Sequence, residues 1–459
     1  MLEFINIDKE KSIIPDSAIE EFENRIFDKG IPFHGYMFLQ GKEIVAEKYF
    51  EGYTRDSLHR MYSITKSFVA VAIGILIKQG RLNYEDKIVD YFPEMLEKEV
   101  HPWLVEMTIE DMLSMRTCYG DTTYKHKEFF NGDWTKSFFK VTPDHIPGTV
   151  FNYDTSSAHT LGALVEKMTH MSVLDFLRKE LLDELGFSKD AYIIKDPVGV
   201  SQGGSGMMST MMDVAKVAYV LNHKGMVDGK ELLSSDFVES ATKFQVPTCL
   251  QPTIDERQGY GYMIWKTRRP GFVLYGMGGQ LAVCFPEYDF IYLTMADTIG
   301  NGAGLQIIYD CFYDTIYPYL EKHYGKVEKK ISNEKSELAK KNGKADYIFY
   351  ENKLGFEKLE LDFESNKFEL ETEQQNFIFK IKENEWVEQI FPGTTYKCKC
   401  KASWENKQMI LQTYVCDEEQ GHISFIIGWK DDTRISIRVN STNEPFLCGL
   451  KGFASAEIK

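Results

Sequence analysis

The chain lacks a hydrophobic run long enough to cross a membrane. Its longest apolar stretch, residues 68–77, lies between Lys66 and Lys78, whereas a membrane-spanning helix needs about 20 predominantly apolar residues. The N-terminal sequence "MLEFINIDKEKSIIPDSAIEEF" also lacks the basic start and long apolar segment of a secretory signal. We therefore expect no membrane span and a cytoplasmic location.

A strongly basic surface is absent as well. The 53 lysines and arginines are outnumbered by 69 aspartates and glutamates, and the formal net charge is −16. The one lysine-rich stretch, "KVEKKISNEKSELAKK" at residues 326–341, is short and also contains glutamates. Because nucleic-acid binding requires a clustered basic surface, nucleic acid is not an expected partner. The oligomeric state is left open.

The sequence has no pattern of closely paired metal ligands. Its eight cysteines are spread along the chain and are expected to be ordinary reduced thiols: Cys118, Cys249, Cys284, Cys311, Cys398, Cys400, Cys416 and Cys448. The only close pair is Cys398 and Cys400, and no second Cys/His pair stands at ligand spacing. Two residues at this spacing share one face of a strand. We expect no metal and no cofactor.

The length of 459 residues favours two or three domains. Residues 1–325 mix helical and strand patterns: a hairpin at residues 35–53, a helix capped by Thr108, two helices ending at Gly186, two strands around Pro286 and a closing helix at residues 304–320. Residues 326–345 are charged and predict a linker or solvated helix. Alternating apolar and polar residues from 346 to 459 predict an antiparallel barrel or sandwich.

One apolar helix begins with a serine and a lysine spaced so that the lysine could act as a base for the serine. The sequence "MYSITKSFVAVAIGILIKQG", residues 61–80, contains Ser63 and Lys66. Side chains at i and i+3 share one helix face, about 5–6 Å apart at Cβ. A serine hydroxyl needs a base to become a nucleophile, and desolvation can lower the pKa of a lysine enough for this task. The free N–H groups at the helix start would also stabilise an oxyanion.

The alternative interpretation is a serine N-cap beside an interfacial lysine. The spacing S-x-x-K is weak evidence alone, because it recurs at Ser137/Lys140, Ser240/Lys243 and Ser332/Lys335. Only the first occurrence opens a helix that is apolar on every side. The rest of the sequence must therefore decide between the two interpretations.

Four ordered motifs resemble those of the serine β-lactamase and penicillin-binding protein superfamily. The S-x-x-K motif corresponds to "YSITKSF", and the second-motif tyrosine to Tyr153 in "HIPGTVFNYDTSSAHTLG". A Gly-Gly turn leading into a helix corresponds to "SQGGSGMMSTMMDVAKVAYVL", with Gly203, Gly204 and Asp213. The third motif corresponds to "LYGMGGQLAVCFPE". The resemblance covers roughly residues 20–320 and is closest to class C-like hydrolases and esterases, including the 6-aminohexanoate-dimer hydrolase branch.

The resemblance implies a fold and a set of roles. The fold would be α/β (α+β), an antiparallel sheet flanked by helices plus a helical subdomain in residues 1–325. Ser63 would form an acyl-enzyme, and Lys66 and Tyr153 would share the proton transfers. The backbone N–H groups of Ser63 and Gln280 would form the oxyanion hole.

The third motif departs from the family in a way that bears on substrate. Met277, followed by Gly278 and Gly279, stands where Lys or His is usual, and Thr155 replaces the usual Asn. In the family, these two positions help to hold the substrate. Both changes weaken the case for β-lactam hydrolysis and favour a small ester or amide substrate.

Other interpretations stay open. One is a β-lactamase or D-amino-acid peptidase of the same fold. Another is a non-catalytic binding protein that keeps the pocket, for which the absent basic residue is the supporting feature. The C-terminal β domain could bind a ligand or partner, although a packing or lid module that shapes the cleft is the simpler expectation.

Overall fold

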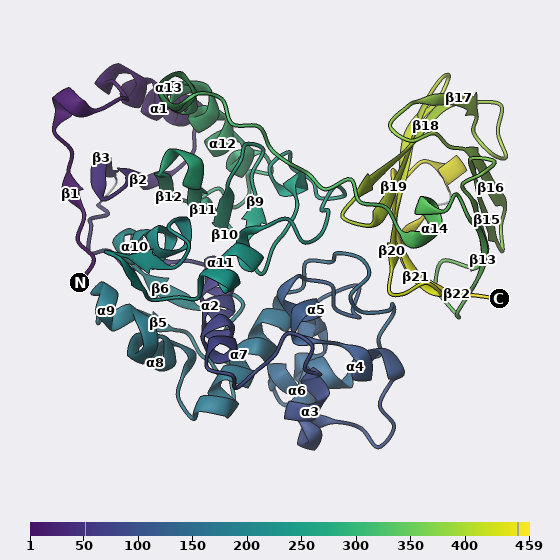
Figure 1. The fold of residues 1–459 in the computed structure, drawn as a ribbon, viewed down its shortest axis with the longest axis horizontal. Coiled ribbons are helices and arrows are strands. Elements are labelled where there is room, and N and C mark those ends of the chain that lie inside the picture. Colours follow the sequence, from purple (N-terminus) through teal and green to yellow (C-terminus); the bar gives the residue numbers. More distant parts are fainter. Residues whose placement is uncertain (51, 448) are drawn as a thin grey trace. The chain divides into compact units, whose positions relative to one another are not determined.

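The chain folds as two units, each assembled from separate stretches of sequence. The computed structural model describes residues 1–50, 52–447 and 449–459, with the backbone alone for residues 127–130, so that Cys448 lies outside the described residues. The first unit contains Met1–Tyr84, Tyr124–Phe138 and Thr155–Lys330. The second contains Glu85–Thr123, Phe139–Asp154 and Ile331–Lys459. Each unit is shown within Figure 1.

The first unit is built around a seven-stranded sheet of order β1-β3-β2-β12-β11-β10-β9. Neighbouring strands are antiparallel except for β1 and β3. Its strands, with those of two small sheets, are β1 (Ile5–Asn6), β2 (Phe33–Gln40), β3 (Glu43–Tyr49), β4 (His59–Arg60), β5 (Tyr192–Ile193), β6 (Met207–Ser209), β7 (Met226–Val227), β8 (Lys230–Glu231), β9 (Trp265–Lys266), β10 (Phe272–Gly276), β11 (Gln280–Phe285) and β12 (Phe290–Ala296).

Helices cover this sheet. The helices of the first unit are α1 (Asp16–Asp28), α2 (Ile64–Lys78), α7 (Thr155–Thr169), α8 (Val173–Leu177), α9 (Asp183–Leu185), α10 (Met211–Asn222), α11 (Ser235–Thr242), α12 (Gly304–Thr315) and α13 (Tyr317–Tyr324), and α6 (Trp134–Lys140) crosses into the second unit. Helices α1 and α12 pack together, while α10 packs on β11 and β12 and α2 packs on β10 (Figure 1).

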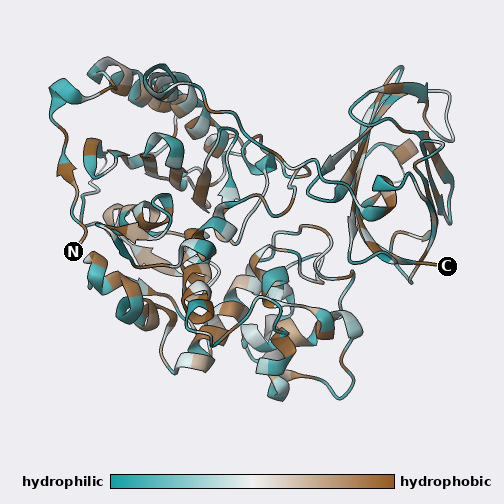
Figure 2. Ribbon diagram, in the orientation of Figure 1, coloured by the Kyte–Doolittle hydropathy of each residue, from teal (hydrophilic) through white to brown (hydrophobic). Residues whose placement is uncertain are grey.

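Helix α2 is the most deeply buried helix of the first unit. All of its residues from Ile64 to Leu76 are buried, and Figure 2 shows the helix as predominantly hydrophobic. Helices α7 and α8 pack against it. A helix that is apolar all round is expected in the interior of a large domain. A polar residue on this helix is therefore held in a fixed, water-poor environment.

The second unit contains a nearly closed ten-stranded antiparallel barrel of order β16-β15-β14-β13-β22-β21-β20-β19-β18-β17. Its elements are α3 (Ile88–Tyr91), α4 (Pro102–Glu106), α5 (Ile109–Leu113), α14 (Glu337–Lys340), β13 (Lys344–Phe349), β14 (Phe356–Asp362), β15 (Lys367–Thr372), β16 (Asn376–Lys380), β17 (Val387–Ile390), β18 (Lys397–Glu405), β19 (Gln408–Cys416), β20 (Gln420–Trp429), β21 (Arg434–Ser441) and β22 (Lys451–Ile458).

Aromatic and aliphatic side chains fill the barrel interior. They include Phe356, Phe368, Phe377, Phe379, Phe391, Trp404 and Phe425. Cys398 and Cys400 are both buried on the inner face of β18, which confirms that they share one face of a strand. Burial raises the pKa of the Cys398 thiol to about 11 and that of Cys400 to about 12. Both are therefore protonated, inert core residues at neutral pH.

Most predicted elements of the first 325 residues are present, with two corrections. The closing helix expected at residues 304–320 is divided at Ile316 into α12 and α13. Thr108 caps α5 in a capping box with Asp111, and the helices before Gly186 end in a left-handed glycine. Strands β11 and β12 flank Pro286 as expected, but the stretch contains three strands and not two, because β10 is also present. The first predicted strand is divided into β10 and β11 by a turn at Gly278 and Gly279, which have φ angles of 87° and 94°. Left-handed φ angles of this kind favour glycine.

No helix in the described part of the chain has the length and apolar character needed to cross a bilayer.

Candidate active site

Ser63 stands at the start of α2 without capping it. Its side chain makes no capping hydrogen bond, in contrast with Thr108 and Thr210, whose hydroxyls accept from the backbone of their own helices. The preceding residue, Tyr62, has a φ angle of 45°, which is uncommon for a bulky residue. Strained backbone of this kind is concentrated at functional sites. The hydroxyl of Ser63 is thus available for a different partner.

That partner is Lys66. Its Nζ lies 2.9 Å from Ser63 Oγ and donates a 2.6 Å hydrogen bond to the carbonyl oxygen of Gly204. Lys66 is only 1% exposed, so its ammonium group does not extend to the solvent. The alternative of an interfacial lysine beside a capping serine does not describe this geometry.

The turn before α2 is held from both sides. Met61 N donates to Met207 O at 2.9 Å, and Met207 N donates to Thr65 Oγ1 at 3.0 Å. These bonds tie the turn to β6. Ser67, one helical turn after Ser63, donates to Met263 O at 2.8 Å. The backbone around Ser63 is therefore fixed by hydrogen bonds to two distant segments.

The Gly-Gly turn lies directly against α7. A Cβ atom on Gly203 would be 2.8 Å from Ala158 O, and one on Gly204 would be 2.5 Å from Thr155 Cγ2. Side chains at either position would separate the turn from the helix. Two glycines therefore allow the turn to bring the Gly204 carbonyl to Lys66, and they place Thr155 beside Gly204.

The third-motif residues form the turn between β10 and β11. Met277 is half-exposed at 50%. Gln280 is buried, and its side-chain amide donates to Met277 O at 3.0 Å and to Ala296 O at 2.9 Å. Its Oε1 accepts from Ala296 N at 3.2 Å. The side chain of Gln280 thus locks the turn to the neighbouring strand β12.

Gly276 is a site residue that the sequence analysis missed. A Cβ atom on Gly276 would lie 2.3 Å from Met61 O, so the end of β10 directly touches the turn that carries Ser63. Gly276 pairs with Gln280 across the hairpin. The pattern Gly-x-Gly-Gly in the sequence was the available signal, because repeated glycines mark close backbone approach.

Tyr153 belongs to the second unit and is half-buried there. It follows Asn152, whose backbone N–H donates to Met115 O at 2.8 Å and whose side-chain amide donates to Tyr119 O at 3.0 Å. Asp154 N donates to the sulfur of Met115 at 3.4 Å. The residues on both sides of Tyr153 are therefore anchored to residues 115–119.

His59, on the chain segment that leads to Ser63, contacts His34 of β2. His59 Nε2 is 2.7 Å from His34 Nδ1. Burial, and then the proximity of His34, lower the pKa of His59 below its ordinary value. His59 is therefore neutral at neutral pH and does not place a positive charge near the start of α2.

The lysines of two other S-x-x-K sequences have carboxylate partners. Lys140 pairs with Glu97, and Lys335 pairs with Glu383. Lys243, in the remaining sequence, is exposed. Of the four S-x-x-K sequences, Lys66 is thus the lysine that is buried beside its own serine, so the spacing alone does not produce this arrangement. Among the described residues, no cluster of His, Cys, Asp and Glu is arranged to hold a metal ion.

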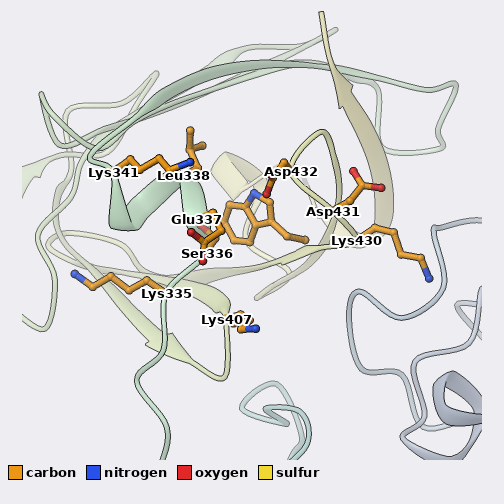
Figure 3. Close-up of a pocket in the computed structure, with 10 residues that line it drawn as sticks. Lys335, Ser336, Glu337, Leu338, Lys341, Lys407, Lys430, Asp431 and Asp432 are labelled. Carbon is orange, nitrogen blue, oxygen red and sulfur yellow. The ribbon is translucent and has the colours of Figure 1, made fainter. Parts of the chain in front are cut away.

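A separate pocket of about 360 Å³ opens in the second unit beside α14 (Figure 3). Its charged lining residues are Lys335, Glu337, Lys341, Lys407, Lys430, Asp431 and Asp432. Ser336 in this pocket caps α14, since its Oγ accepts from Ala339 N at 3.3 Å. Its hydroxyl thus has the ordinary capping role that Ser63 lacks, and the pocket offers no comparable chemistry.

Comparison with known proteins agrees with this geometry. The sequence matches the Beta-lactamase family over residues 19–302. A 6-aminohexanoate-dimer hydrolase of Paenarthrobacter ureafaciens is 24% identical over 220 residues, which cover 45% of this chain. The match spans only 56% of the length of that relative.

Solved structures show the same fold. A penicillin-binding protein homolog from Caulobacter crescentus has a TM-score of 0.54 and 17% identity, covering 67% of this chain and 99% of that chain. The hydrolase EstCE1, described as having promiscuous acyltransferase activity, has a TM-score of 0.53 and 14% identity, covering 65% of this chain and 99% of that chain. The predicted superfamily and fold are confirmed, and the chain belongs to the Beta-lactamase family.

Proposed function

We propose that this chain is a serine hydrolase that cleaves a small ester or amide through an acyl-enzyme on Ser63. The observation that carries the proposal is the pair of Ser63 Oγ and Lys66 Nζ, 2.9 Å apart, with the lysine 1% exposed. Burial favours the neutral form of an amine, which can accept a proton. A nucleophile within hydrogen-bond reach of its base is the arrangement that covalent catalysis requires.

The proposed reaction has two halves. In the first, the Ser63 hydroxyl proton passes to the Lys66 amine while Oγ bonds to the substrate carbonyl carbon. The tetrahedral intermediate then collapses, and the leaving alcohol or amine departs with a proton from the Lys66 and Tyr153 pair. In the second half, water gives a proton to the Lys66 and Tyr153 pair as its oxygen bonds to the acyl carbon. The bond from this carbon to Ser63 Oγ then breaks, Oγ takes the proton back from the pair, and the acid leaves.

Two features support a proton-transfer role for Tyr153. The first is its position in the second motif. The second is chain connectivity, because Tyr153 is two residues before Thr155, and two residues of chain reach at most about 7 Å. Thr155 in turn lies beside Gly204, whose carbonyl binds Lys66.

The oxyanion would be bound by backbone N–H groups. Ser63 N–H, at the start of α2, is the first donor. The motif assigns the second to Gln280, and the contact of Gly276 with Met61 makes the N–H of Met277 an additional candidate. Loss of one such donor typically costs about 10²–10³ in rate.

The substrate class follows from the third motif. Met277 is uncharged and half-exposed, so it provides apolar contact surface where a lysine would bind a carboxylate. Thr155 offers a hydroxyl where the family usually has an amide. These two side chains favour a neutral ester or amide over a carboxylate-bearing β-lactam.

The proposal is tested by turnover of p-nitrophenyl acetate and a chromogenic cephalosporin by the full-length protein. We expect ester turnover by the wild type, and background rates for Ser63→Ala and Lys66→Met. Lys78→Met is the matched control, because it changes the same residue type on the surface end of α2, where Lys78 pairs with Glu231, and it should retain turnover. Background ester turnover by the wild type would contradict the proposal, and preferred turnover of the cephalosporin would favour a β-lactamase.

A further inference from the structure

The segment that leads into Tyr153 is bound by strands of the C-terminal barrel. Ile146 N donates a 3.0 Å hydrogen bond to Ser455 Oγ on β22. The side-chain amide of Gln408, at the start of β19, donates to the carbonyl oxygen of Thr149. All of these groups belong to the second unit. Barrel side chains thus satisfy backbone groups of a segment more than 250 positions earlier in the sequence.

Arg438 on β21 binds the backbone two residues before Tyr153. Its guanidinium group donates to the carbonyl oxygen of Phe151, two residues before Tyr153. The same group lies over the ring of Phe453, 5.4 Å from its centroid. Phe453 also stacks on His145, with ring centroids 4.4 Å apart and an interplanar angle of 12°. Arg438 and Phe453 therefore hold both ends of residues 145–151.

The barrel backbone also approaches this segment closely. A Cβ atom on Gly428 of β20 would lie 2.1 Å from Thr149 O, so this position must lack a side chain for the contact to form. On its other side, the segment is bound by residues 115–119: Gly148 N donates to Arg116 O at 2.8 Å, and Asn152 N donates to Met115 O at 2.8 Å. Residues 146–152 are thus held between the barrel and residues 115–119.

We infer that the barrel is a positioning element for Tyr153, acting through Arg438, Gln408 and Ser455 on the backbone of residues 146–151. The inference rests on the proposed proton-transfer role of Tyr153. A general acid or base must lie within about 2.6–3.2 Å of its partner, and a displacement of about 1 Å can cost roughly 10²-fold in rate. Fixing the backbone two residues before the tyrosine restricts such a displacement.

Arg434 provides a matched control for Arg438. It lies on the same strand and binds Glu106 through two hydrogen bonds of 2.8 and 3.0 Å. It therefore also joins the barrel to residues 85–123, but it does so away from the segment that carries Tyr153. Replacing either arginine by methionine removes the donors and keeps a long apolar side chain.

The experiment compares kcat and KM for p-nitrophenyl acetate in Arg438→Met, Arg434→Met, Tyr153→Phe and the double variant Tyr153→Phe/Arg438→Met. We expect Arg438→Met to lower kcat by roughly 10- to 100-fold with little change in KM, and Arg434→Met to keep the wild-type kcat. Arg438→Lys should restore part of the rate. In the double variant, the Arg438 substitution should add little to the loss from Tyr153→Phe, because coupled residues are not additive.

Several outcomes would overturn the inference. Wild-type kcat in Arg438→Met, an equal loss in Arg434→Met, or multiplied losses in the double variant would each show that the barrel does not act through Tyr153. If Arg438→Met does not fold, as judged by its thermal midpoint, Gln408→Met takes its place with the same expectations. Wild-type kcat in Tyr153→Phe would instead contradict the proposed role of the tyrosine itself, and the inference with it.

Discussion

Ser63 differs from the other helix-starting hydroxyl residues in what its side chain binds. Thr108 and Thr210 accept from their own helices, whereas Ser63 faces a buried amine. An N-cap hydrogen bond typically stabilises a helix by about 0.5–2 kcal/mol. Ser63 lacks this bond, and Tyr62 before it has a left-handed backbone. Both features lower the local stability at the site of the proposed chemistry.

Gly276 is predicted to be intolerant of even a methyl group. A Cβ atom there would lie 2.3 Å from the backbone oxygen of Met61, and backbone cannot move away as a flexible side chain can. We expect Gly276→Ala to lower thermal stability by about 1–3 kcal/mol, as overpacking does, and to reduce ester turnover. Gly302→Ala is the control, because a Cβ atom there meets nothing within 4 Å. Equal behaviour of the two variants in thermal melts and turnover assays would refute the assigned contact.

Met277 is predicted to set charge selectivity. Because its side chain is 50% exposed, a lysine at this position can extend to the solvent without burying its charge. We expect Met277→Lys to raise kcat/KM for a carboxylate-bearing ester relative to a neutral ester of the same length. The ratio of the two kcat/KM values is the measurement, and an unchanged ratio would place Met277 outside the substrate site.

At the scale of elements, Gln389 on β17 bridges to β16, the strand at the other end of the barrel sheet. Gln389 accepts from Lys380 N and donates to Lys380 O, both at 3.0 Å. Its amide thus pairs with the backbone of Lys380 as a neighbouring strand would. We expect Gln389→Ala to lower the free energy of unfolding by about 1 kcal/mol.

Glu388 serves as the control for Gln389. It is an exposed neighbour on the same strand, and it pairs with Lys399 on the surface. Glu388→Ala should cost no more than about 0.5 kcal/mol. Equal losses from the two substitutions in chemical denaturation would mean that the bridge from Gln389 does not stabilise the barrel.

Elements with a clear local pattern could be predicted from the sequence. The barrel strands alternate apolar and polar residues, the capping box at Thr108 has a fixed spacing, and α2 is a continuous apolar run. The division of one predicted strand into β10 and β11 was missed, because the left-handed turn at Gly278 and Gly279 interrupts residues that are otherwise strand-like.

The site was predictable in part. The i, i+3 spacing of Ser63 and Lys66 follows from helix geometry alone. The contact of Lys66 with Gly204, and of Gly276 with Met61, joins residues far apart in the sequence. No local pattern encodes such tertiary contacts. The sequence therefore indicates that backbone approaches Gly204 and Gly276 closely, but it does not indicate which segment does so.

At the scale of the whole molecule, the two units do not follow the order of the sequence. Residues 85–123 and 139–154 belong with the barrel and not with the seven-stranded sheet. The contacts of Arg434 with Glu106 and of Phe453 with His145 lie within this unit. The sequence predicts a hydrolase domain at residues 1–325, a linker at 326–345 and a β domain at 346–459. Whether the first of these folds independently stays a prediction.

Truncation after Lys330 tests that prediction. Removal of the barrel exposes the partners of Arg434, Gln408 and Phe453 in residues 85–154, so we expect the truncated chain to lose cooperative unfolding and ester turnover. Amide hydrogen exchange should show the loss of protection in residues 139–154 first. A truncated chain that unfolds cooperatively and turns over ester at the wild-type rate would show instead that residues 1–325 form an autonomous hydrolase.

The central claim is that Ser63 becomes acylated. The most direct measurement is mass spectrometry of the full-length protein, acid-quenched during turnover of p-nitrophenyl acetate and then digested. The account predicts one added acetyl group on the peptide that contains Ser63, and none on this peptide in Ser63→Ala. Because fast deacylation leaves little acyl-enzyme to detect, the quench is repeated with a slowly hydrolysed carbamate ester. An adduct on a different residue, or none with either reagent, would contradict the account.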